Sequence, residues 1–177
     1  MYRPLLILFL VCFSCFKSLQ AQQALNQQEL LDSIHILDEI LQHAEDVNDD
    51  TEAANRYINL VEQLSKSYAS CEQLPELLFR AGDVSVGLAT YDRSLQLWEQ
   101  LIKQYPGHAL NPRALFFQGF VLDTKMGQDA LAKTKYESFI NKYPAHELNS
   151  NASLLLSQLG QSDTDLLKQF KIDNKQR

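Results

Sequence analysis

The sequence contains little glycine, proline or cysteine. Its 177 residues include 6 glycines, 5 prolines and 3 cysteines, and no segment alternates apolar and polar residues over a useful length. Because a half-buried strand shows a two-residue period, the lack of alternation argues against β-structure. Hydrophobic residues make up 45% and charged residues 21% of the chain. This composition and length are typical of one ordinary folded domain.

The sequence also lacks the motifs of common enzymes. It contains no phosphate-binding loop, dinucleotide fingerprint, His-Glu-x-x-His motif or Gly-x-Ser-x-Gly elbow. His35 and His43 are eight residues apart, with no third metal ligand near them in sequence, and the acidic cluster 46–52 lacks EF-hand spacing. We therefore expect no enzymatic activity and no metal or other cofactor.

Positive charge is outnumbered by negative charge. The 16 Lys and Arg residues face 22 Asp and Glu residues, which gives a formal net charge of −6, and no window forms a basic stripe. Proteins that bind nucleic acid carry clustered basic side chains. The charge therefore argues against nucleic acid as a partner.

The N-terminus has the three parts of a secretory signal. Arg3 precedes an apolar run, 4–16, and a short polar stretch ends at the small residue Ala21. We predict cleavage after Ala21 and export to the periplasm or cell envelope. Two alternatives stay open. One is an uncleaved membrane anchor, although the run is shorter than the roughly 20 residues of a membrane helix. The other is lipid attachment at Cys15, which follows the small Ser14.

Cleavage would leave a single cysteine. Cys12 and Cys15 lie within residues 1–21, so the mature chain, 22–177, would keep only Cys71. One cysteine cannot form an internal disulfide, so the mature domain must be stabilised by packing. The removed segment carries two basic residues and no acid. The mature charge, from 14 basic and 22 acidic residues, is −8.

An internal repeat runs through the rest of the chain. Residues 105–111, Tyr-Pro-Gly-His-Ala-Leu-Asn, return 38 residues later as 143–149, Tyr-Pro-Ala-His-Glu-Leu-Asn. The preceding helix recurs as well, since 60–68 matches 97–105 at a distance of 37. This self-similarity is typical of helical repeat arrays, in which each unit buries its apolar face on the next.

Apolar residues at helical spacing predict eight helices. Pro75 and Pro112 fall at helix starts, where a missing N–H costs little. Asn111 and Asn149 precede their helices as N-cap candidates, and the polar turn 48–51 offers Asp or Thr as a cap. We place the helices near 25–46, 51–68, 75–89, 91–105, 112–126, 129–143, 149–159 and 163–172.

The pattern resembles the tetratricopeptide repeat, a helix-turn-helix unit of about 34 residues. In one unit the characteristic positions hold Leu78, Ala81, Gly82, Trp98, Leu101 and Pro106. In the next they hold Leu115, Gly119, Leu122, Gly127, Ala132, Tyr136 and Pro144. Ser94, Gln118 and Phe139 depart from the usual residue types. The endings Tyr105-Pro106 and Tyr143-Pro144 are similar to those of extracytoplasmic members, which include outer-membrane assembly lipoproteins and a division protein associated with the Tol-Pal system.

The resemblance implies an all-α fold. We expect a right-handed α-solenoid of antiparallel helix pairs, with about three repeats plus a C-terminal capping helix. The expected units are 25–68, 75–106, 112–144 and 149–172. The overall layout also resembles small secreted repeat proteins of Bacteroidota envelopes.

Close packing of these helices needs small residues opposite large ones. Gly82, Gly119 and Ala132 are the small residues, and Trp98 and Tyr136 are expected to fill the wedge between hairpins.

The resemblance also implies that the first helix of each hairpin lines a concave binding face. The candidates there are Phe79, Asp83, Phe116, Phe117, Phe120 and Asp123. Neighbours on a helix differ by about 100°, so the three phenylalanines within 116–120 cannot all join one core stripe. We expect at least one of them to be partly exposed. Burial between hairpins and a partner-binding surface both remain open.

The expected function is a non-enzymatic scaffold for protein–protein interaction in the cell envelope. A TPR-like groove would bind a peptide or helix of another protein, whose identity the sequence does not give. Two alternatives remain. The chain could self-associate as a structural homo-oligomer through the helix 112–126, or it could be a lipoprotein subunit of an outer-membrane assembly machinery, anchored at Cys15.

Overall fold

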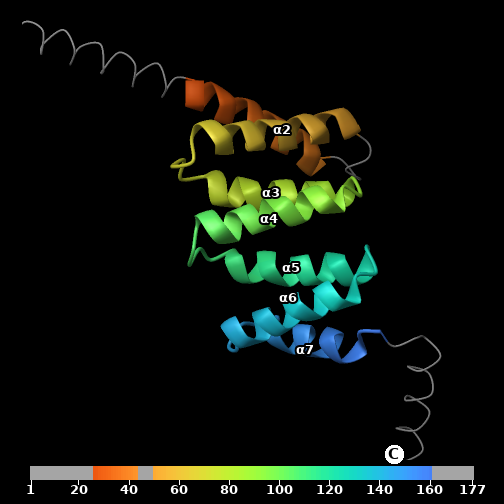
Figure 1. The fold of residues 1–177 in the computed structure, drawn as a ribbon. Coiled ribbons are helices and arrows are strands. Elements are labelled where there is room, and N and C mark those ends of the chain that lie inside the picture. The colour runs from red at the N-terminus through yellow and green to blue at the C-terminus, as the bar shows by residue number, and fades with distance from the viewer. Residues whose placement is uncertain (1–25, 44–49, 161–177) are drawn as a thin grey trace, which may run out of the picture. The chain divides into compact units, whose positions relative to one another are not determined.

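The computed structural model describes residues 26–43 and 50–160, and within these ranges every regular element is a helix. Figure 1 shows their order. The first helix covers 26–43. The others are α2 (Thr51–Ser67), α3 (Leu74–Gly87), α4 (Tyr91–Gln104), α5 (Asn111–Thr124), α6 (Asp129–Lys142) and α7 (Asn149–Gln158). The predicted all-α fold is confirmed, while the predicted signal, 1–21, and the predicted last helix, 163–172, lie outside the described residues.

The chain divides into two compact units, Met1–Leu74 and Pro75–Arg177. In the first unit the helix over 26–43 pairs with α2 (Figure 1). Each helix buries one apolar stripe, which includes Ile34 in the first helix and Val61 in α2. Asp50 caps α2, since its Oδ1 accepts a hydrogen bond from the Ala53 N–H at 2.9 Å. The predicted capping of α2 from the polar turn is therefore confirmed.

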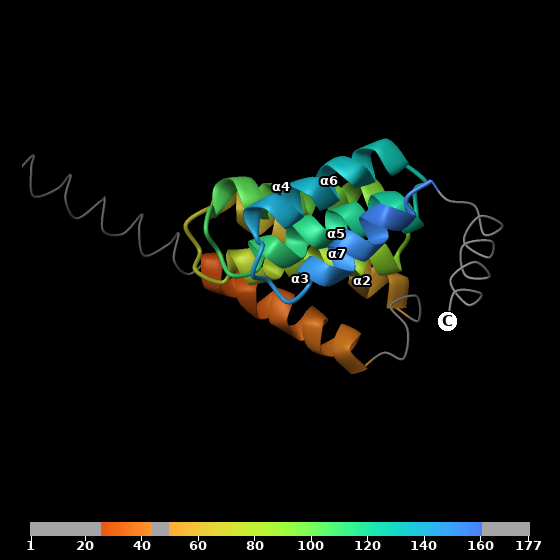
Figure 2. The same ribbon diagram turned by 90° about the horizontal axis from the view of Figure 1, so that it is seen from below.

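The second unit is a stack of helix hairpins. The hairpin α3–α4 is followed by α5–α6 and then by α7 (Figure 1). Seen along the stack, α3, α5 and α7 form one layer and α4 and α6 form another (Figure 2). First and second helices of the repeat therefore occupy separate layers, so each layer presents its own surface.

The turns between hairpins repeat in detail. The His108 N–H donates to the Tyr105 carbonyl at 3.1 Å, and the His146 N–H donates to the Tyr143 carbonyl at 3.1 Å. In both turns the histidine Nδ1 accepts a backbone N–H from two residues later, at 3.3 Å and 3.1 Å. The first unit uses the same backbone bond from Cys71 to the Tyr68 carbonyl, at 2.9 Å. The sequence repeat is therefore a repeat of turn geometry.

The N-cap prediction for Asn111 and Asn149 is wrong. They are the first residues of α5 and α7, because Leu110 and Leu148 occupy the N-cap positions. The Asn111 Nδ2 instead donates back to the Tyr105 carbonyl at 2.8 Å. These asparagines therefore satisfy carbonyls at the end of the preceding helix rather than N–H groups of their own helix.

Aromatic rings lie directly on glycine in both hairpins. A Cβ on Gly82 would lie 2.6 Å from Cδ1 and Cε2 of Trp98, and one on Gly119 would lie 2.9 Å from Cδ1 and Cε1 of Tyr136. The Trp98 Nε1 donates to the Phe79 carbonyl at 3.1 Å, which satisfies the buried indole. The core around them also contains Leu78, Leu101, Leu115, Ala132 and Phe139.

Candidate functional site

The six residues predicted to line a partner surface lie on α3 and α5. Phe79 and Phe116 are 6% and 7% exposed, so their rings belong to the core. Phe117, Phe120, Asp83 and Asp123 are partly exposed. The expectation that a phenylalanine within 116–120 stays partly exposed therefore agrees with Phe117 and Phe120.

The phenylalanines form a chain of ring contacts with the repeat aromatics. The centroid of Phe117 lies 6.0 Å from that of Trp98 and 6.2 Å from that of Phe79. Phe116 lies 6.1 Å from Tyr136, and the Arg113 guanidinium lies 5.1 Å from the Phe79 centroid. These contacts link α3, α4, α5 and α6 into one aromatic core.

The two candidate carboxylates of this layer are partly desolvated. Burial raises the pKa of Asp83 to about 6, against the opposing charges of Arg80 and Arg113. Burial also raises the pKa of Asp123, although its Oδ2 accepts a hydrogen bond from the Tyr136 hydroxyl at 3.3 Å. Within the described ranges no three His, Cys, Asp or Glu side chains form a group that could hold a metal ion.

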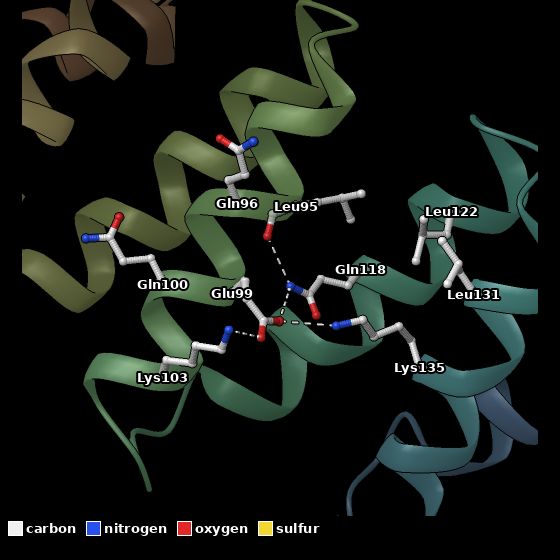
Figure 3. A pocket seen from close by; sticks show the side chains of 9 residues that line it. All are labelled: Leu95, Gln96, Glu99, Gln100, Lys103, Gln118, Leu122, Leu131 and Lys135. Atoms are coloured by element: carbon white, nitrogen blue, oxygen red, sulfur yellow. Dashed lines mark hydrogen bonds and ion pairs between the residues drawn. The ribbon is translucent and has the colours of Figure 1, made fainter.

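A pocket opens between α4, α5 and α6 (Figure 3), and none of the six predicted residues lines it. Its volume is about 510 Å³. Most of its lining is apolar surface from leucines and aliphatic stems, with charged groups at one side. The lining residues are Leu95, Gln96, Glu99, Gln100 and Lys103 of α4, Gln118 and Leu122 of α5, and Leu131 and Lys135 of α6.

Glu99 is the centre of the polar side of the pocket. Its Oε1 contacts the Lys103 Nζ at 3.2 Å, and its Oε2 contacts the Lys135 Nζ at 3.2 Å and the Gln118 Nε2 at 3.1 Å (Figure 3). Burial alone would raise the pKa of Glu99, but the hydrogen bonds from Gln118, Lys135 and Lys103 outweigh it and lower the pKa to about 2. The carboxylate is therefore ionised at neutral pH.

Gln118 joins the pocket to the core. Its side chain is 1% exposed, and its Nε2 also donates to the Leu95 carbonyl at 3.1 Å. Its Oε1 is buried and has no hydrogen-bond partner among the residues that the structure describes. The sequence did contain a signal for this site, because Gln118 stands where the repeat normally has an apolar residue. The interpretation missed the pocket because it placed binding on the first-helix layer.

The hairpins α3–α4 and α5–α6 define a helical repeat protein. Residues 76–108 and 113–146 match the tetratricopeptide repeat family. Each match begins within a residue of the predicted units 75–106 and 112–144, so these two units are tetratricopeptide repeats, and the predicted class of helical-repeat solenoid is confirmed. Such repeats typically act as non-catalytic scaffolds for protein–protein interaction. No curated protein matches the chain.

Among the described residues, no helix is both long enough and apolar enough to cross a membrane. The apolar run 4–16, on which the predicted signal, the membrane anchor and the Cys15 lipid site depend, lies outside these residues.

Proposed function

We propose that this protein is a non-enzymatic interaction module, exported to the cell envelope, that captures a peptide segment or a helix of another protein. The pocket between α4, α5 and α6 is the observation that carries this proposal. Its volume of about 510 Å³ lies in the range of roughly 300–1,000 Å³ that is common for binding sites. Its mainly apolar lining with a few placed polar groups is also typical of such sites.

The helices around the pocket are held by packing that does not involve the pocket itself. The ring of Trp98 fixes α4 on α3 across Gly82, and the ring of Tyr136 fixes α6 on α5 across Gly119. A preformed site orders few groups when its partner arrives, so less of the contact energy is lost to conformational entropy. The repeat packing thereby supports binding of an extended or helical segment.

Export is supported by the N-terminal pattern. Arg3, the apolar run and Ala21 fit a signal peptide. An envelope location would make the partner another envelope protein. The chain's excess of acidic residues is consistent with a protein partner rather than nucleic acid.

The test is to capture binding partners from crosslinked cells with three versions of the mature chain. These are the wild type, Leu131→Glu in the pocket, and Phe120→Asp on the α5 surface, each checked for native helicity and melting temperature. Leu131 is suitable because it is 55% exposed, so the change should not disturb the core. We expect Leu131→Glu to lose an envelope protein that Phe120→Asp retains. Loss only with Phe120→Asp would move the binding surface to the first-helix layer, and no loss with either would contradict the proposal.

Self-association is a second candidate, favoured by exposed apolar side chains. Ile36 and Ile40 lie one helical turn apart on the helix 26–43 and are both exposed. Contiguous exposed apolar side chains often mark contact surfaces. Sedimentation of the mature chain over a hundredfold range of concentration separates the two candidates, since a concentration-independent monomer mass would contradict self-association.

A further inference from the structure

We infer that the partner of the α4–α5–α6 pocket is a peptide segment in which a large apolar side chain lies next to a carboxylate; this inference rests on the proposed function. The apolar side chain would occupy the leucine-lined part of the pocket. The carboxylate would accept from the N–H groups of Lys103 and Lys135 that Glu99 does not use.

The leucine-lined part of the pocket leaves apolar surface exposed to water, which is unfavourable. Leu95, Leu122 and Leu131 come from three different helices and face one space (Figure 3). Leu131 is an exposed large hydrophobic residue, so a bound apolar side chain would remove it from water. Burial of apolar area in this way is the main favourable term in binding a peptide side chain.

The charged side of the pocket favours an anion. Lys103 and Lys135 both contact Glu99, so the lining residues carry two positive charges and one negative charge. This local excess of positive charge stands out in a chain whose formal net charge is −6. An arriving carboxylate therefore meets complementary charge.

Glu99 itself has little capacity left for a cationic partner. Its two oxygens already accept from Lys103, Lys135 and Gln118. Each lysine ammonium has three N–H donors and uses one of them on Glu99, which leaves donors for a second acceptor. A ligand carboxylate at these free donors would extend an alternating arrangement of negative and positive groups. A ligand ammonium there would instead face both lysines at short range.

The positions of the two lysines also favour a carboxylate ligand. Lys103 lies on the same helix as Glu99, one turn further along, whereas Lys135 reaches Glu99 from α6 (Figure 3). The two ammonium groups are thus drawn toward one carboxylate from different helices. A ligand carboxylate that accepts from the remaining ammonium donors would gain charge attraction that an amide lacks. The pocket should therefore distinguish Asp or Glu from Gln or Asn beside the apolar side chain.

The experiment is selection of a displayed library of random twelve-residue peptides on the mature full-length chain. Four proteins are compared: wild type, the double variant Lys103→Gln/Lys135→Gln, Leu131→Glu, and Lys133→Gln. The last is a matched control. Lys133 lies on α6, as Lys135 does, but it is exposed, contacts Glu137 and does not line the pocket. Circular dichroism and melting temperature verify that all four are folded.

We expect peptides selected on wild type and on Lys133→Gln to be enriched in Asp or Glu adjacent to Leu, Ile, Met or Phe. The enrichment in acid should disappear on the double variant, while the apolar preference remains. A synthetic copy of the best peptide should bind the double variant roughly three- to tenfold more weakly by fluorescence anisotropy, and addition of salt should reduce this difference.

Three results would count against these ideas in distinguishable ways. Peptides that depend on Leu131 but show no acid enrichment would overturn the inference and leave the proposed function standing. Acid enrichment that persists on the double variant would also overturn it, since the carboxylate would then bind elsewhere. Absence of any peptide that is lost on Leu131→Glu would contradict the proposed function of the pocket itself.

Discussion

At the scale of single residues, the absence of one methyl group decides how closely two helices approach. Gly82 and Gly119 stand at equivalent repeat positions, and in each case the space of a Cβ is taken by the ring of Trp98 or Tyr136. Glycine costs about 1 kcal/mol in a helix interior. Burial of a large aromatic ring contributes more than this cost. The glycines are therefore favourable here only because of the rings that cover them.

A double-mutant cycle tests this dependence. We expect Gly82→Ala to destabilise the protein by about 1–3 kcal/mol through overpacking, and Trp98→Ala by about 3–5 kcal/mol through lost burial. The three atoms nearest to a Cβ at position 82 all belong to Trp98. In the Trp98→Ala background Gly82→Ala should therefore cost nothing or stabilise slightly. Equal costs of Gly82→Ala in both backgrounds, measured by urea unfolding, would refute the assignment.

Asp83 predicts a pH dependence of stability. Its pKa rises from the ordinary value of 3.8 to about 6 in the folded protein. Between these values the folded state holds a proton that the unfolded chain has released, so stability falls as pH rises through this window. Asp83→Asn removes the charge and should stabilise the protein at pH 7.5 by about 1–2 kcal/mol, with little effect at pH 4.

Urea unfolding of Asp83→Asn at pH 4 and pH 7.5 is the measurement, with Asp92→Asn as the control on an exposed aspartate of α4. A stability gain for Asp83→Asn that is the same at both pH values would show that the proton on Asp83 is not its source.

At the scale of helices, the turn between hairpins is held from the start of the following helix. Asn111 is buried and its Nδ2 donates to the Tyr105 carbonyl at 2.8 Å. Asn149 is partly exposed and makes longer bonds, at 3.3 Å to Tyr143 and 3.4 Å to Ile140. The same residue type therefore contributes unequally in the two turns.

We expect Asn111→Ala to cost about 1–2 kcal/mol, because it removes a buried side chain together with its hydrogen bond to the Tyr105 carbonyl, which then keeps the His108 N–H as a donor. Asn149→Ala should cost less than half as much. Thermal unfolding of the two single variants gives the comparison, and a larger loss for Asn149→Ala would contradict the expected order.

The helices were predictable because two local signals agreed, the spacing of apolar residues and the position of proline at the helix starts. Apolar spacing predicted 129–143 and the structure has Asp129–Lys142, while the prediction 112–126 compares with Asn111–Thr124 for α5. The role of Asn111 was not predictable. An N-cap and the first helical residue differ by one position, and the choice depends on the backbone of Leu110, which is already α-helical in conformation.

The pocket was harder to predict than the fold. Gln118 was recognisable as a departure from the repeat. Its partner Glu99 is 19 residues away in sequence, and Lys135, which also contacts Glu99, is 17 residues away from Gln118. They meet only because α4 and α6 lie in one layer with α5 beneath them (Figure 2). A periodic pattern gives the face of each helix and not the distance between successive second helices.

At the scale of the whole molecule, export predicts a particular mature chain. Cleavage after Ala21 would give an N-terminus at Gln22. Intact-mass spectrometry of the protein recovered from cells should find the mass of residues 22–177. A mass that corresponds to acylated Cys15 would favour the lipoprotein alternative, and an uncut chain would favour the membrane anchor.

The polar network of the pocket is not repeated at the equivalent described positions of the two neighbouring units. The position of Gln118 is held by Ala81 in the preceding unit, 37 residues earlier, and by Leu156 in the following one, 38 residues later. Neither alanine nor leucine can donate a hydrogen bond to a glutamate. Although the architecture is periodic, the described residues carry this chemistry at one repeat position. If the pocket binds the proposed peptide, this part of the chain offers one such site, and bridging two of these ligands would require two copies of the chain.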